Sequence, residues 1–211
     1  MHDQKKLWNK AHEQESIHHY STQPTSFFEE VNKIIPPASR ILELGCGVGN
    51  DSIGFAEAQH TLIATDLSEV AIDKNKERFK NIPNLNFETL DMSEPLRFHD
   101  NEFDAIYARL SLHYFTNEVT RKIFSEIHRV LKPNGYLCFI CKSTNDPLYG
   151  KGTEIEKDMF EHNGHIRHFF SEEYAKSLLE NKFKIEKIES GDEKFYGNNS
   201  AFVKSISRAI K

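Results

Sequence analysis

Short apolar runs alternate with amphipathic stretches over most of the chain, and the two patterns predict different elements. Short runs that are rich in branched or aromatic side chains and bounded by turn residues predict strands, at residues 41–44, 61–66, 85–90, 103–108 and 136–142. Stretches in which apolar residues recur every three or four positions predict helices, at residues 24–35, 50–58, 68–80 and 119–131. This alternation predicts an α/β fold with a doubly wound, mostly parallel sheet covered by helices on both faces.

The last third of the chain has a weaker pattern. Between residues 143 and 167 the periodicity is weak and glycines recur, so we expect a long loop with at most one short helix. Ser171 is expected to cap a helix, and residues 183–189 and 201–210 alternate enough to form a closing pair of strands. We interpret residues 1–211 as one domain with four parts: an N-terminal helical lid (1–37), a cofactor-binding core (38–142), a substrate lid or insert (143–170), and a closing helix with strands (171–211).

The first predicted strand ends in a glycine-rich segment, RILELGCGVGNDS. Gly45, Gly47 and Gly49 occupy alternate positions in it. Because glycine weakens ordinary strands and helices, three glycines in this pattern indicate a tight turn or a ligand lying against the main chain. Ligands of open parallel sheets bind beyond the carboxyl ends of the strands, and the helix that follows this turn offers free N–H groups there.

Carboxylates at the ends of the next two predicted strands extend this site. Asp66 ends the second strand about 20 residues after the glycines, where a carboxylate can accept hydrogen bonds from ribose hydroxyls. Asp91 and Met92 end the third strand, and they can contact the amino group and one ring face of an adenine. Three neighbouring strand ends therefore offer backbone, ribose and base contacts to one nucleoside.

The glycine spacing distinguishes two classes of nucleoside ligand. The dinucleotide fingerprint requires a third glycine at position 50, but this position is Asn50. A pyrophosphate favours positive surroundings, whereas Glu43, Asp51, Asp66 and Asp91 cluster at these strand ends. A nicotinamide-dependent oxidoreductase is therefore disfavoured, and a cationic ligand without phosphate is favoured.

Composition and charge narrow the class of protein. The chain has 211 residues, of which 38% are hydrophobic and 28% charged, so a packed domain is expected. The net charge of -5 and the lack of a Lys/Arg block disfavour a nucleic-acid partner, and no apolar run is long enough to predict a membrane span. Three cysteines suit a reducing compartment, so we expect a cytoplasmic protein. Cys138 and Cys141 lie within one apolar strand on opposite faces, which predicts buried structural thiols.

Five ordered segments, ILELGCGVGN, ATDLS, LDM, FDAIYA and LKPNGYLCFI, resemble the motifs of class I S-adenosylmethionine-dependent methyltransferases. The resemblance covers about residues 24–142 and continues more loosely in FFSEEYAKSLLENKFKIEKIE. It implies a Rossmann-like seven-stranded sheet whose last strand is antiparallel, with S-adenosylmethionine as cofactor and S-adenosylhomocysteine as product. The implied cofactor contacts are Glu43, Gly45, Gly47 and Gly49 at the methionine part, Asp66 at the ribose, Leu67, Asp91 and Met92 at the adenine, Ala108 and Arg109 beside the methionyl end, and Tyr20 in the lid.

The sulfonium of this cofactor makes its methyl group electrophilic, so the protein must mainly align the reactants and exclude water. His113 follows the fourth predicted strand and can act as a base or contact the substrate, or it can pack under the next helix. His165 and Arg167 are candidate substrate-pocket residues, and Arg167 can pair with an acidic acceptor. We expect no metal at the nearby histidines, because a loop leaves their geometry unset.

The acceptor is expected to be a small molecule. Residues 108–111 lack the Asn/Asp-Pro-Pro-aromatic motif of enzymes that methylate amino groups in nucleic acids, and the segments left to form the pocket are lid-like. The chain is loosely similar to the thiopurine- and tellurite-detoxifying type of methyltransferase. The alternative function is a non-catalytic S-adenosylmethionine-binding protein that acts as a regulator or partner subunit. A monomer or homodimer is expected.

Overall fold

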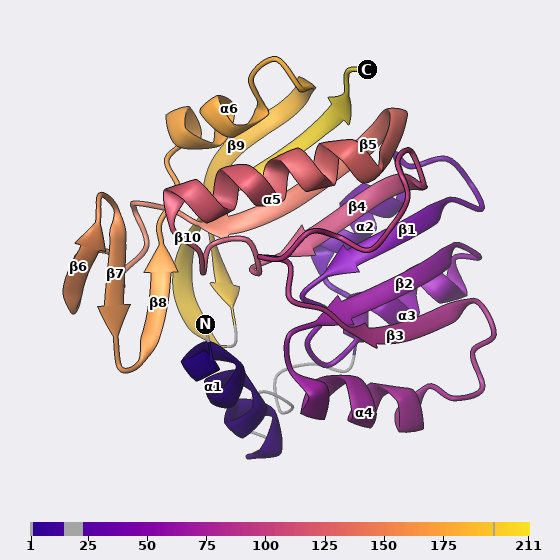
Figure 1. Cartoon of the computed structure of the whole chain (residues 1–211), viewed down its shortest axis with the longest axis horizontal. Coiled ribbons are helices and arrows are strands. Elements are labelled where there is room, and N and C mark those ends of the chain that lie inside the picture. Colours follow the sequence, from indigo (N-terminus) through magenta and orange to yellow (C-terminus); the bar gives the residue numbers. More distant parts are fainter. Residues whose placement is uncertain (1, 15–22, 196) are drawn as a thin grey trace.

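The computed structural model describes residues 2–14, 23–195 and 197–211, so the Tyr20 assignment lies outside the described residues. A seven-stranded sheet with the order β3-β2-β1-β4-β5-β10-β9 forms the centre of the fold (Figure 1). Its strands are β1 (Arg40–Leu44), β2 (Thr61–Asp66), β3 (Leu85–Thr89), β4 (Phe103–Arg109), β5 (Leu131–Lys142), β9 (Phe183–Phe195) and β10 (Asn198–Ala209). Strands β1 to β5 pair in parallel, whereas β10 is antiparallel to both β5 and β9. The predicted fold class is confirmed.

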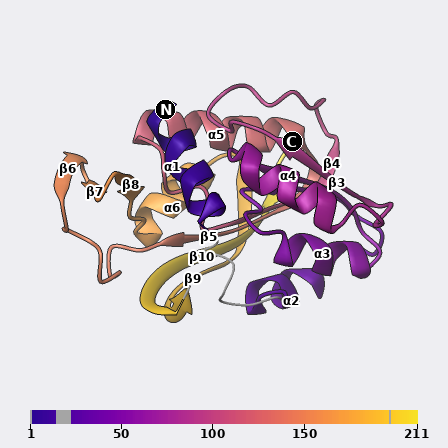
Figure 2. The ribbon, with the colours of Figure 1, turned by 90° about the horizontal axis from the view of Figure 1, so that it is seen from below.

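The helices cover the sheet on both faces (Figure 2). They are α1 (His2–Glu13), α2 (Ser26–Asn32), α3 (Asn50–Glu57), α4 (Glu69–Arg78), α5 (Asn117–Val130) and α6 (Glu172–Leu179). Four of them begin after a Ser or Thr whose side-chain oxygen accepts a hydrogen bond from a backbone N–H of the first turn: Thr25, Ser68, Thr116 and Ser171. The caps predicted at Ser68 and Ser171 are confirmed.

Alternation along the central strands divides the core into two clusters. In β1, Leu42 and Leu44 pack on the side of α5 and α6, whereas Ile41 packs on the side of α2 and α3. In β5, Cys141 belongs to the first cluster and Cys138 to the second, and both thiols are fully buried. The opposite orientation expected for these cysteines is therefore confirmed, because successive strand side chains point to opposite faces.

The expectation of a long loop between residues 143 and 167 is wrong. This segment forms a second, three-stranded antiparallel sheet of β6 (Thr153–Glu156), β7 (Met159–His162) and β8 (His165–His168). In the β7–β8 turn, Asn163 and Gly164 have φ values of 53° and 80°, which is the left-handed pair of a two-residue hairpin turn. The Asn-Gly pair was the available signal, but strands of four residues are too short for a periodic pattern to stand out.

Two other predicted boundaries are also wrong. Strand β9 extends to Phe195, and β5 begins at Leu131 directly after α5, so the Pro-Asn-Gly segment lies inside a strand. The register of β4 and β5 shifts between Phe103 and Ala105, where β5 accommodates this segment. A proline and a left-handed Asn134 therefore produce an irregular strand rather than a loop.

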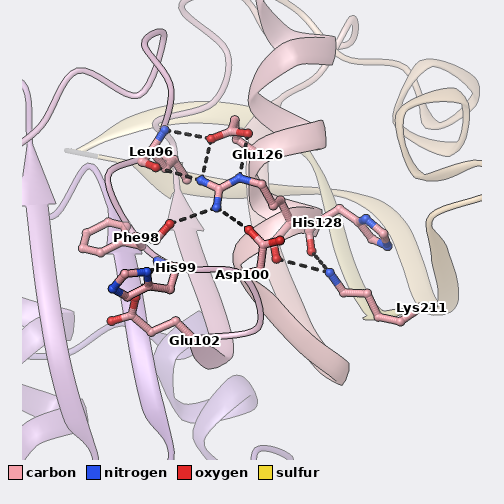
Figure 3. A network of polar contacts seen from close by, with 9 residues as sticks. Leu96, Phe98, His99, Asp100, Glu102, Glu126, His128 and Lys211 are labelled. Atoms are coloured by element: carbon pink, nitrogen blue, oxygen red, sulfur yellow. Dashed lines mark hydrogen bonds and ion pairs between the residues drawn. The ribbon is translucent and has the colours of Figure 1, made fainter.

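Arg129 on α5 anchors the loop between β3 and β4, and Figure 3 labels the loop residues of this network, Leu96, Phe98 and Asp100. Its guanidinium donates hydrogen bonds to the backbone oxygens of Leu96 (2.7 Å) and Phe98 (2.9 Å) and to the carboxylate of Asp100 (2.7 Å). Glu126 completes the network, since it accepts from both Arg129 and the backbone N–H of Leu96. The loop that follows Asp91 and Met92 is thereby fixed against α5.

Candidate active site

A cavity of about 450 Å³ lies beyond the carboxyl ends of β1, β2 and β4. The turn after β1 forms its floor, because the backbone N–H groups of Gly45 and Cys46 both donate to the Thr65 carbonyl at 2.8 Å. The N–H of Gly47 donates to the Asp66 carboxylate at 2.9 Å. These bonds join the turn to the backbone and the carboxylate at the end of β2.

The three glycines of this turn have different roles. A Cβ on Gly45 would lie 2.3 Å from the Cβ of Ser111, and one on Gly49 would lie 3.1 Å from the ring of Phe79. A Cβ on Gly47 would meet only the ring of His12, at 3.9 Å. All three have positive φ, which favours glycine. Gly45 and Gly49 therefore allow the chain to pack closely on itself, whereas Gly47 has room where a Cβ would lie.

One side of the cavity, which we call the acidic wall, carries Glu43, Asp51 and Asp66. Each of these carboxylates accepts hydrogen bonds from the protein. Asp66 accepts from the N–H groups of Gly47 and Ser68, and Glu43 accepts from the Ser52 hydroxyl at 2.5 Å.

Asp51 completes the acidic wall and is 6% exposed. Its carboxylate accepts from the backbone N–H of Thr25 and from the hydroxyl of Tyr107, both at 2.7 Å. Burial, and then the charges of Asp51 and Asp66, raise the pKa of Glu43 to about 8. The acidic wall therefore favours a positively charged ligand, because a cation would offset this repulsion.

Helix α1 roofs the cavity, and it lies between α4 and β8 (Figure 1). Gln4 donates to the Gly164 carbonyl in the β7–β8 turn at 3.0 Å. On the other side, Asn9 accepts from the hydroxyl of Ser68, and Lys74 donates to the backbone oxygen of His12. The helix thus bridges the core and the small second sheet above the cavity.

The opposite side of the cavity, which we call the basic wall, carries His113, Lys142 and Arg167. His113 is fully buried, and neither of its ring nitrogens has a hydrogen-bond partner among the residues that the structure describes. Burial, and then the charges of Lys142 and Arg167, lower its pKa well below the usual value. The imidazole is therefore neutral at physiological pH.

The two cations of the basic wall are in different states. Lys142 donates to the Asp146 carboxylate at 2.8 Å and to the Ser200 hydroxyl at 2.9 Å, so its charge is balanced. Arg167 makes no ion pair with any described residue, and its Nε atom is buried without a hydrogen-bond partner. Arg167 therefore leaves an unbalanced positive charge beside His113.

Aromatic rings cover the same end of the cavity. Trp8 of α1 meets the ring of Tyr114 edge-on at 5.1 Å between centroids and the ring of His165 at 5.4 Å. The rings of His113 and Tyr114 lie 4.4 Å apart. His165 and Arg167 share one face of β8, because residues two apart in a strand point the same way, and both line the cavity.

The structure brings together most, but not all, of the residues proposed from sequence. Those that line the cavity are Glu43, Gly45, Gly47, Asp66, Leu67, Met92, Arg109, His113, His165 and Arg167. Three others lie outside its lining. Gly49 precedes α3 as its N-cap, Ala108 is in the core, and Asp91 accepts hydrogen bonds from Ser93. Within the described residues no group of three His, Cys, Asp or Glu side chains is placed to hold a metal ion.

Sequence reasoning missed several cavity residues. Trp8, Thr25 and Lys142 line the cavity from three separate segments. Lys142 had a signal, since it is the only charged residue in the apolar run YLCFICK. Trp8 stands out as the one tryptophan of the chain, in a polar segment, which allowed either a packing anchor or a substrate contact. Thr25 had no signal, because nothing in its local pattern specifies which part of the fold it covers. None of the helices in the described ranges is long and apolar enough to cross a bilayer.

Residues 41–135 match a protein-family model described as a methyltransferase domain. The chain is 31% identical over 109 residues to an uncharacterised methyltransferase of Synechocystis, which covers 52% of this chain and 50% of that protein. It is also 31% identical over 109 residues to a demethylmenaquinone methyltransferase of Clavibacter sepedonicus, over 52% of this chain and 43% of that protein. The match thus spans half or less of the length of these relatives.

The fold is shared with a solved structure, the 1,6-didemethyltoxoflavin-N1-methyltransferase of Burkholderia thailandensis with bound 1,6-didemethyltoxoflavin and S-adenosylhomocysteine. The TM-score is 0.78 at 16% identity, over 99% of this chain and 88% of that chain. The family match falls on the glycine turn and the strands that carry the acidic wall. Residues 41–135 of this chain thus match a methyltransferase domain, and the whole chain shares its fold with a solved methyltransferase.

Proposed function

We propose that this protein transfers a methyl group from S-adenosylmethionine to a small-molecule acceptor. The observation that carries the proposal is one cavity with two unlike ends. The acidic wall suits a cationic nucleoside, and the basic wall with its aromatic cover offers a separate place for the acceptor. A single enclosed space allows the two reactants to meet in line and away from water.

The residues of the acidic wall support the proposed cofactor contacts. Asp66 is already oriented by the N–H groups of Gly47 and Ser68, and its carboxylate oxygens have room for further ribose hydroxyl bonds. Leu67 and Met92 supply apolar surface for the adenine, and Arg109 stands on the methionyl side. The cofactor supplies the electrophilic methyl group, and these residues hold its nucleoside and its charge.

Glu43 complements the cation differently. Its carboxyl group is buried beneath the turn, and its pKa of about 8 means that it holds a proton in the free protein at neutral pH. A bound cation stabilises the ionised form, so we propose that cofactor binding releases this proton. Asp91 and Gly49 do not line the cavity, so their proposed roles are indirect. Asp91 accepts a hydrogen bond within the loop that follows β3, and Gly49 is the N-cap of α3.

On the acceptor side, His113, His165 and Arg167 are the proposed substrate contacts. The low pKa of His113 favours a hydrogen-bonding role, because such an imidazole holds a proton weakly once it has taken one. Two relatives carry names that describe methyltransferases of small molecules, demethylmenaquinone and 1,6-didemethyltoxoflavin, which supports an acceptor of this general size. The cytoplasmic location, the monomer or homodimer, the four-part division of the domain and the thiopurine or tellurite likeness stay predictions.

Calorimetry with the Asp66→Ala variant tests the cofactor assignment. We expect S-adenosylhomocysteine to bind the unchanged protein and to bind the variant about 30-fold more weakly, which corresponds to roughly 2 kcal/mol for lost hydrogen bonds to a charged group. Asp91→Ala is the matched control, because Asp91 ends the next strand without lining the cavity. Equal affinities for the unchanged protein and Asp66→Ala would contradict the ribose assignment.

Transfer of labelled methyl groups from S-adenosylmethionine into a metabolite extract tests catalysis. The proposal expects a labelled small molecule that is absent when the protein is omitted. Tight cofactor binding with no labelled product would favour the non-catalytic alternative.

A further inference from the structure

The basic wall combines buried ring nitrogens of His113 with the positive charge of Arg167, and a neutral acceptor would leave this charge unpaired. His113 is fully buried and lines the cavity, and its two ring nitrogens have no partner within residues 2–14, 23–195 and 197–211. Buried polar atoms are nearly always hydrogen-bonded, so such a group needs an explanation. A ligand that accepts a hydrogen bond from one of these nitrogens would supply it.

Two cations, Lys142 and Arg167, act on His113, and His168 acts on it more weakly. Lys142 already pairs with Asp146, and His168 faces the backbone oxygen of Phe115. Arg167 alone keeps an unbalanced charge, and its buried Nε atom has no partner within the described part of the chain. A guanidinium in this state matches a carboxylate, whose two oxygens it can bind side by side.

The shape of this end of the cavity specifies the rest of the ligand. Trp8, Tyr114 and His165 present ring edges and faces to one another around it. Flat aromatic surfaces of this kind favour a planar ring, which packs edge-on or offset against them. The acidic wall occupies the far end, so a carboxylate is repelled there and attracted here. The charge of the two walls therefore directs the cationic cofactor to one end of the cavity and a carboxylate of the acceptor to the other end.

We propose that the methyl acceptor is a small planar molecule with a carboxylate, which Arg167 and His113 bind while Trp8 and His165 cover its ring. This inference rests on the proposed function and deepens it by naming the substrate class. His113 donates one ring N–H to the carboxylate and needs no change of protonation to do so. Arg167 and His113 are therefore specificity residues, and the methyl-accepting atom is a different part of the acceptor.

Matched pairs of acids and amides test this proposal. Benzoate, phenylacetate and indole-3-acetate are compared with their primary amides by calorimetry, in protein saturated with S-adenosylhomocysteine and again without it. We expect at least one acid to bind tenfold or more tighter than its amide, and inorganic phosphate alone to bind more weakly than that acid. If the amides bind as tightly as the acids, if phosphate binds as tightly, or if no acid binds, the proposal is overturned.

Substitutions at Arg167 locate the preference. Arg167→Gln should abolish the preference for acids, and Arg167→Lys should keep part of it, because the charge remains while the paired geometry is lost. Lys157→Gln is the control, since it removes one positive charge from the exposed β6–β7 turn of the same sheet. An unchanged preference in Arg167→Gln would overturn the assignment. Failure of S-adenosylhomocysteine to bind would instead contradict the proposed function, and the series without it still reports on the carboxylate site.

Discussion

The two walls of the cavity differ in how far the protein satisfies its own polar groups. Each carboxylate of the acidic wall accepts hydrogen bonds from nearby backbone or hydroxyl groups, as Asp66 does from Gly47 and Ser68. In the basic wall, both nitrogens of His113 and the Nε of Arg167 have no partner in the described chain. The acidic wall is therefore organised before any ligand arrives, whereas the basic wall keeps hydrogen-bonding capacity for one.

The origin of the two walls also differs. The acidic wall comes from β1, β2 and the start of α3, which follow one another in the sequence. The basic wall is assembled from the ends of β4 and β5 and from β8 in the second sheet. Local chain geometry can build the first wall, but the second depends on tertiary packing.

The largest expected effect concerns the buried charge of the acidic wall. The pKa of Glu43 rises from 4.5 in the unfolded chain to about 8 in the folded protein. The folded state thus holds a proton that the unfolded state loses, and the stability from this group is lost as the pH rises from 4.5 through 8. At about 1.4 kcal/mol per pH unit, the unchanged protein should lose up to about 4 kcal/mol relative to Glu43→Gln between pH 5 and 8.

Urea unfolding at pH 5, 6, 7 and 8 measures this difference. The glutamine keeps an oxygen that can accept from the Ser52 hydroxyl, so it isolates the charge from the hydrogen bond. Parallel stability curves for the two proteins would mean that Glu43 ionises normally, and the acidic wall would lose its bias toward a cation.

The next effect tests whether the floor of the acidic wall depends on bare backbone. Gly45→Ala should destabilise the protein by about 3 kcal/mol, because left-handed backbone costs an alanine roughly 1–2 kcal/mol and the Cβ would collide with Ser111. Gly47→Ala is the matched control. Its Cβ meets only His12 at 3.9 Å, so about 1 kcal/mol is expected. Equal losses in denaturant unfolding would show that close packing against Ser111 does not require Gly45.

The smallest expected effect is on the free energy of unfolding of a His113 variant, and it tests whether the basic wall has unsatisfied polar groups. His113→Leu should leave the free protein unchanged or stabilise it by about 1 kcal/mol, because it removes two unsatisfied buried nitrogens at similar volume. His60 is the control, since its ring nitrogens face the Ser39 N–H at 3.1 Å and Asn32 Oδ1 at 3.0 Å. His60→Leu should therefore destabilise by about 2 kcal/mol. Comparable losses in both variants, measured by thermal unfolding, would indicate that His113 has a structural role instead.

The acidic half of the site could be predicted from sequence because its residues are positioned by short-range rules. Helix α3 and strand β2 separate Asp66 from the glycines. Because β1 and β2 are parallel, their carboxyl ends lie at the same edge of the sheet. Asp91 satisfied the same rule but lies outside the cavity lining, since its side chain accepts from the following Ser93 instead. The position of a residue along a strand predicts where its backbone lies. Hydrogen bonds to neighbouring residues then decide whether its side chain points into the cavity.

The sequence by itself determined the order of β1 to β5 and of the helices between them, the two-sided core and the glycine turn, because periodicity and glycine spacing are local. Only the tertiary structure decided that the predicted loop is a second sheet and that β8 brings Arg167 beside His113. The backbone N–H of His168 donates to the His113 carbonyl at 2.9 Å, which joins two segments far apart in the chain. No local pattern encodes such a contact, because its free energy comes from the packing of elements that meet only in the folded protein.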